Sequence, residues 1–82
     1  MPFVQRVEHH EYILIAVLQG GLDGHDIVVG ADCYDRDGTY KGFWEIANMP
    51  PGLPDKLAAY TKRMHLAYPQ PRRVIRDTKD LD

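Results

Sequence analysis

The chain has 82 residues, of which ten are basic and twelve acidic, so its net charge of −2 selects no class of partner by itself. This length is sufficient for one domain with a small core. We therefore treat residues 1–82 as a single domain and expect residues 77–82 to form a flexible tail. The single cysteine excludes a disulfide within the chain and is typical of a reducing compartment, which predicts a cytoplasmic protein.

The apolar run from Tyr12 to Leu18 predicts a strand whose two faces are both apolar. It is far shorter than the roughly 20 residues that span a bilayer, and acidic residues precede it, so it predicts neither a membrane span nor a secretion signal. Alternation along the strand gives two groups of side chains: Ile13, Ile15 and Val17 on one face, and Tyr12, Leu14, Ala16 and Leu18 on the other. Because one helix covers only one face, we expect a second copy of the chain or a larger protein to cover the other.

The segment from Asp35 to Gly38 can be interpreted as part of a calcium-binding loop or as the turn of a β-hairpin. A calcium loop with Asp35 and Asp37 at its third and fifth positions has Cys33 in place of the first oxygen ligand, and its glutamate, Glu45, comes one residue late. Asp-Gly between aromatic or apolar runs is a strong hairpin signal, because glycine accepts a positive φ without a steric clash. The sequence therefore predicts a hairpin turn at this position.

The remaining elements complete a small α+β fold. Residues 25–34 and 39–46 form the two strands of the hairpin, and a helix begins near Pro54. Apolar residues recur along this helix at spacings of four and three, up to its predicted end before Pro69: Leu53, Leu57, Tyr60, Met64 and Ala67. We predict an antiparallel sheet of three to five strands in βββα order packed on one helix, with residues 3–7 and 72–76 as candidate edge strands at the two ends.

Metal binding and catalysis find little support in the sequence. His9 and His10 are adjacent and would point to opposite faces of an extended chain, and no group of histidines and cysteines has the spacing of a zinc motif. A site assembled in three dimensions from one of these histidines with His25 and Cys33 is the alternative that the sequence leaves open. The chain contains no serine and no phosphate-binding glycine loop. We predict a protein that is not an enzyme and that uses no metal or cofactor.

Basic residues concentrate in the second part of the chain, where residues 53–82 carry seven basic and four acidic side chains. A small DNA- or RNA-binding protein would use the basic helix and the arginine-rich segment that follows it, through Lys62, Arg63, Arg72, Arg73 and Arg76. Acidic residues on the predicted strands argue against this function because they repel phosphate groups. Nucleic-acid binding is therefore the alternative hypothesis.

The aromatic residues are numerous for a domain of this size, and one short helix cannot cover all of them. Some of the rings must lie on the face of the sheet without a helix, where they would anchor a protein partner. We predict a non-enzymatic interaction or regulatory module that forms a homodimer or binds a larger protein through a face or edge of its sheet. The predicted interface consists of Tyr12, Leu14, Tyr34, Phe43 and Trp44.

Overall fold

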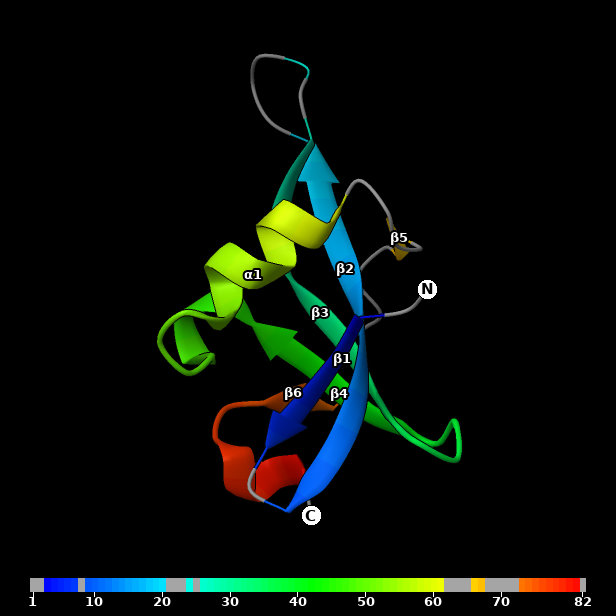
Figure 1. Ribbon diagram of the computed structural model, residues 1–82. Helices are drawn as coiled ribbons and strands as arrows, with labels where there is room; N and C mark the ends of the chain where they lie inside the picture. Colours follow the sequence, from blue (N-terminus) through cyan, green and yellow to red (C-terminus); the bar gives the residue numbers. More distant parts are fainter. Residues whose placement is uncertain are drawn as a thin grey trace.

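The chain forms one curved sheet with a short α-helix against it, as the computed structural model in Figure 1 shows. The structure describes residues 3–7, 9–20, 24, 26–61, 66–67 and 73–81. The strands in these ranges are β1 (Phe3–Val7), β2 (His10–Gly20), β3 (Asp26–Asp35), β4 (Tyr40–Glu45), β5 (Leu66–Ala67) and β6 (Val74–Ile75). Helix α1 (Leu53–Tyr60) and the 3-10 helices η1 (Ile46–Asn48) and η3 (Thr78–Leu81) accompany them. The predicted class, a small sheet packed on one α-helix, is confirmed.

The sheet is mixed, with strands in the order β1-β2-β3-β4-β6 and β5 paired to β2 beside this path. The pairs β1–β2, β2–β3 and β3–β4 are antiparallel, whereas β5 runs parallel to β2 and β6 runs parallel to β4. The antiparallel prediction is therefore correct for the first four strands and wrong for the two short ones. A tight hairpin forces its two strands to be antiparallel, but β5 and β6 follow a helix and longer connections, which allow a parallel direction.

The side chain of Asp35 closes the hairpin turn between β3 and β4. Its Oδ1 atom accepts hydrogen bonds from the main-chain N–H groups of Asp37 and Thr39, each at 2.9 Å. The N–H of Gly38 donates to the Asp35 carbonyl oxygen at 3.1 Å, and Gly38 has a φ of 88°. The predicted turn is confirmed, and the Asp35 carboxylate is used to hold it.

Helix α1 is shorter than the sequence pattern predicts. Leu53, Leu57 and Tyr60 form the apolar stripe that packs against the sheet, as expected. Ala67, which the spacing assigned to the same stripe, lies in β5 instead, and Met64 lies outside the described residues. β5 pairs with the part of the β2 edge that β1 does not cover, so strand hydrogen bonds replace a further helical turn at that position.

The core lies between the sheet, α1 and η3. Trp44 is the largest fully buried side chain, and its indole N–H donates to the carbonyl oxygen of Asn48 at 3.1 Å. Gly42, with a φ of 142°, lets β6 approach β4, because a Cβ atom there would lie 2.7 Å from the carbonyl oxygen of Arg73. This close approach brings Ile75, which is fully buried, beside Trp44 in the core.

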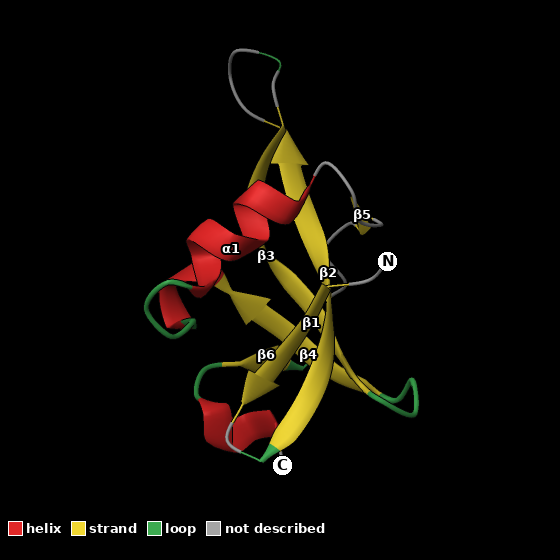
Figure 2. Cartoon of the chain, in the orientation of Figure 1, coloured by secondary structure: helices red, strands yellow, loops and turns green. Residues whose placement is uncertain are grey.

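Residues 78–81 pack against the core, within the segment 77–82 for which the sequence predicts a flexible tail. Residues 78–81 form η3, which Figure 2 shows beside the lower end of the sheet. Leu81 has no exposed surface, and its carbonyl oxygen accepts a hydrogen bond from the hydroxyl of Tyr12 at 3.4 Å. The alternation of charges around Leu81 hides this contact in the sequence, since the apolar residue stands alone.

Candidate interaction surface

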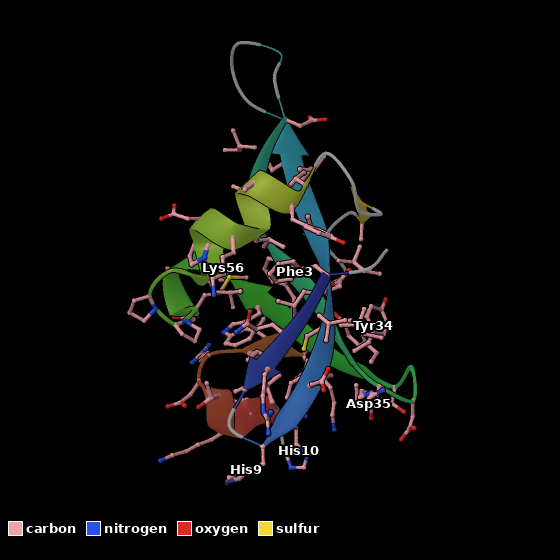
Figure 3. The ribbon with its side chains drawn as sticks, viewed as in Figure 1. Phe3, His9, His10, Tyr34, Asp35 and Lys56 are labelled. Atoms are coloured by element: carbon pink, nitrogen blue, oxygen red, sulfur yellow. The ribbon has the colours of Figure 1, made fainter. Side chains whose placement is uncertain are left out.

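We call the face of the sheet that is turned away from α1 the outer face. Strands β1, β2, β3, β4 and β6 all contribute side chains to it. Register partners project to the same side of a sheet, so the pairing defines two rows of side chains. The first row is Val4, Ile13, Tyr34 and Tyr40, and the second is Ile15, Asp32, Phe43 and Val74. In Figure 3, Tyr34 projects on the side away from α1, whereas Phe3 lies beneath the helix.

These two rows form an apolar band that is open to solvent at both ends. Val4 is 47% exposed and Val74 is 45% exposed, although both are strand residues of a folded sheet. Between them, Ile13, Tyr34 and Phe43 are half-buried. A contiguous apolar band of this kind is typical of a surface that contacts another molecule, because single exposed apolar side chains are common but rows of them are not.

The rings of the outer face are held in place by their neighbours. A Cβ atom on Gly30 would lie 2.7 Å from the ring of Phe43 and would also collide with the carbonyl oxygen of Trp44, so the ring lies directly against the backbone of β3. The rings of Tyr34 and Tyr40 are 5.3 Å apart between centroids, with an interplanar angle of 63°. This edge-to-face contact fixes both rings and leaves little side-chain entropy to lose on binding.

One carboxylate lies in the middle of the band. Asp32 is 1% exposed, and its Oδ1 atom accepts a hydrogen bond from the hydroxyl of Tyr40 at 3.1 Å. A buried carboxylate requires such hydrogen bonds to offset the loss of water. The band therefore contains an acidic residue without presenting its charge at the surface.

The structure separates the five residues of the predicted interface into two groups. Tyr34 and Phe43 lie on the outer face, half-buried. Tyr12, Leu14 and Trp44 are 4%, 0% and 0% exposed and belong to the core on the opposite side of the sheet, so they are not part of the outer face. The alternation separates Phe43 from Trp44 correctly, but the sequence does not show which face of one strand continues onto which face of the next.

Two exposed residues of the outer face were not singled out from the sequence. Val4 lies on β1, which the sequence predicts only as a candidate edge strand, and Val74 lies on β6, which has two residues. The sequence feature that could identify Val4 and Val74 as outer-face residues is their alternation with Phe3 and Ile75, whose side chains both point to the core side. This alternation becomes readable only when the pairing of β1 and β6 is known.

The basic residues of the alternative hypothesis are only partly described. Lys62, Arg63 and Arg72 lie outside the described residues. Arg73 donates from its guanidinium to the carbonyl oxygen of Asp80, and the main-chain N–H of Arg76 donates to an Asp80 carboxylate oxygen at 2.9 Å. Both arginines therefore lie beside η3, and nucleic-acid binding stays a prediction.

The described histidines and the cysteine do not converge. Cys33 is fully buried on the core side, and this burial raises the pKa of its thiol to about 12, so the thiolate needed by a metal or a nucleophilic reaction is scarce. His9 and His10 are exposed at the start of β2, and His25 lies outside the described residues. Within the described part of the chain, no group of three or more potential metal ligands lies close enough together to hold an ion.

The chain was compared with known proteins, and no family model, curated protein or solved structure matches it. Among the described residues, no helix has the length and apolar character to cross a membrane.

Proposed function

We propose that the protein is a non-enzymatic interaction module that forms a homodimer through the outer face of its sheet. The observation that carries this proposal is the apolar band, which crosses five strands and ends in the exposed Val4 and Val74. Covering such a band stabilises a complex by about 25 cal/mol for each Å² of apolar surface removed from water. A chain of 82 residues has a small core of its own and gains from this additional burial.

A second copy of the chain suits this surface because the band carries no exposed charge. In the two described rows the one charged side chain is Asp32, which is 1% exposed. When two copies pack face to face about a twofold axis, each band meets an identical one, and no charge is buried without a partner. Arg6, Glu11 and Glu45 lie on the strands beside the band and are exposed, which is typical of a polar rim.

Sedimentation equilibrium of two matched variants tests the proposal. Val74→Lys places a charge at the exposed end of the band, and Ala58→Lys places the same charge at an exposed position of α1, on the opposite side of the sheet. We expect the wild type and Ala58→Lys to dimerise alike, and Val74→Lys to weaken the dimer at least about tenfold, which corresponds to about 1.4 kcal/mol. Unfolding curves of both variants establish that the monomers remain folded.

Two results would contradict the proposal. A wild-type protein that sediments as a monomer at millimolar concentration does not self-associate through any face. A dimer that Ala58→Lys weakens as much as Val74→Lys does not use the outer face. Binding of duplex or single-stranded DNA by the wild-type monomer, lost at moderate salt, would instead support the alternative function.

A further inference from the structure

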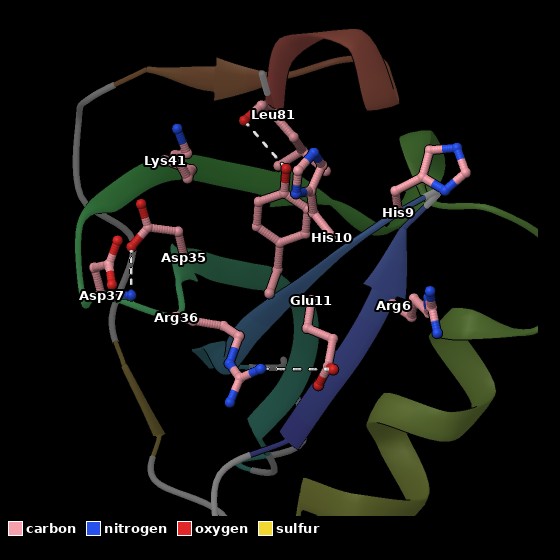
Figure 4. Close-up of a pocket in the computed structure, with 10 residues that line it drawn as sticks. Arg6, His9, His10, Glu11, Asp35, Arg36, Asp37, Lys41 and Leu81 are labelled. Carbon is pink, nitrogen blue, oxygen red and sulfur yellow. Dashed lines mark hydrogen bonds and ion pairs between the residues drawn. The ribbon is translucent and has the colours of Figure 1, made fainter.

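A second candidate site lies away from the outer-face band, at the end of the sheet where the β1–β2 connection, the β3–β4 turn and η3 meet. A depression of about 540 Å³ opens to solvent there, and Tyr12 and Leu81 are among the residues that line it. Figure 4 shows this region. Its volume is in the range of small-molecule sites, which is roughly 300–1,000 Å³. The lining is mainly polar, so the charges of the lining side chains decide which class of ligand this depression binds.

Histidines are the unexpected part of this lining. His9 and His10 were expected to point to opposite faces of an extended strand, but both line the depression. The reason is that His9 belongs to the turn before β2, whereas His10 is the first residue of the strand. Both side chains are exposed and lie at the same end of the sheet in Figure 3.

The acidic residues of the depression are partly neutralised by their own neighbours. Glu11 lies 3.8 Å from the guanidinium of Arg36, and Asp35 accepts two main-chain hydrogen bonds within the turn. Asp37 is the third carboxylate in the lining. Local pairing and hydrogen bonding of this kind reduce the negative potential that a ligand in the depression meets.

The basic residues of the lining come from different elements. Arg6 is on β1, Arg36 is in the turn and Lys41 is on β4. Among the described lining residues, three basic and three acidic side chains therefore balance while the two histidines are uncharged. Protonation of both histidines changes this balance to a charge of about +2, because each imidazolium adds one positive charge.

We propose that the depression binds a small ligand through an oxyanion group, a phosphate or a carboxylate, when His9 and His10 are protonated. Each histidine is then a charge-assisted donor, and Lys41 adds a third positive group on the opposite side of the opening (Figure 4). The depression lies outside the two rows of the outer face, so binding there is a second function of the chain.

The test is an NMR titration of the full chain with sodium sulfate at pH 5.5 and pH 8.0, at constant ionic strength. Sulfate keeps its charge over this range and represents a phosphate group, and acetate in a parallel titration represents a carboxylate. We expect sulfate to shift the imidazole signals of His9 and His10, with affinity about tenfold higher at pH 5.5. The tighter of the two anions identifies the oxyanion class that the site prefers.

Matched variants assign the effect to the depression. The double variant His9→Gln with His10→Gln should abolish the pH dependence, and Lys41→Ala should weaken binding at both pH values. Lys56→Ala removes an exposed cation of α1, far from the depression in Figure 3, and should change nothing. All substituted positions lie at or near the surface, and the backbone spectrum of each variant reports whether the fold is retained.

Three outcomes would overturn the proposal. Equal affinity at both pH values would show that the histidines do not control binding. Equal weakening by Lys56→Ala and Lys41→Ala would mean an adventitious ion only. An absence of shifts at His9 and His10 up to about 50 mM sulfate would show that the depression does not select oxyanions.

Discussion

At the scale of single residues, the outer face depends on a glycine. Gly30 has no side chain, and for this reason the ring of Phe43 can lie against the backbone of β3. The same position is fully buried, so a larger residue cannot turn toward solvent. A glycine inside a strand normally weakens the strand, and here the lost propensity is offset by the packing of an aromatic ring.

Gly30→Ala should therefore destabilise the protein by about 1–3 kcal/mol, because the added methyl group forces Phe43 and the β3–β4 pairing to move. Gly20→Ala is the matched control on the neighbouring strand. Its Cβ atom would meet no atom closer than 3.9 Å, so the stability should change by no more than about 0.5 kcal/mol. Urea unfolding measures both, and equal effects at the two positions would contradict the role given to Gly30.

Cys33 provides a residue-scale prediction about pH. Burial raises the pKa of its thiol to about 12, and Lys41 lowers it by a smaller amount. The folded state keeps the proton that an unfolded chain releases near pH 8.5, so this contribution to stability is complete at neutral pH and is lost as the pH rises toward 12. We expect the thiol to resist a disulfide reagent at pH 8 and to react at once in urea. Rapid reaction of the folded protein would show that the side chain is accessible.

At the scale of elements, η3 is the segment whose role the sequence hides most completely. Leu81 is fully buried, and Asp80 of η3 is tied to Arg73 and Arg76, the residues on either side of β6. The N–H of Lys79 and the hydroxyl of Thr78 lower the pKa of Asp77, so this carboxylate supports the start of the turn in its charged form. These contacts make the last described residues part of the fold.

Leu81→Ala should accordingly cost about 2–4 kcal/mol, the usual range for removing a large buried aliphatic side chain. Lys79→Ala, at an exposed position of the same 3-10 helix, should change the stability by less than about 0.5 kcal/mol. Thermal or urea unfolding of the two variants makes the comparison. A Leu81→Ala variant as stable as the wild type would mean that η3 does not contribute to the core.

The elements that the sequence predicts well are those with local signals. The turn at residues 35–38 has its own hydrogen bonds, and β2 has a continuous apolar run, so both are readable without knowledge of the rest of the chain. β5, β6 and η3 have two, two and four residues and form because an edge or an opening of the sheet is available to them. Such elements depend on contacts between distant parts of the chain, which no local pattern contains.

The same limit applies to the candidate interface. Alternation within β4 separates Phe43 from Trp44 correctly, but the register with β3 decides that Trp44 faces the core and Phe43 the outer face. Tyr12 and Leu14 were placed at the interface because both faces of β2 are apolar. A strand that is apolar on both sides carries no information about which side the helix covers.

At the scale of the whole molecule, the sheet has one face covered by α1 (Figure 1) and one face with an apolar band that reaches solvent at both ends. The polar depression is at one end of the sheet and includes Arg6 and Glu11 of the polar rim, but neither His9, His10 nor Lys41 belongs to the band or its rim, and Val74 does not line the depression. The two surfaces are therefore separable by mutation. We expect Val74→Lys to leave sulfate binding unchanged, and the double histidine variant to leave dimerisation unchanged.

The most direct test of the homodimer is an isotope-filtered nuclear Overhauser experiment on an equal mixture of ¹³C-labelled and unlabelled protein. We expect contacts between protomers that involve the methyl groups of Val4 and Val74 and the ring of Phe43. Contacts between protomers that arise only from exposed residues of α1, such as Ala58, would contradict it. So would a complete absence of such contacts in a sample that sediments as a dimer.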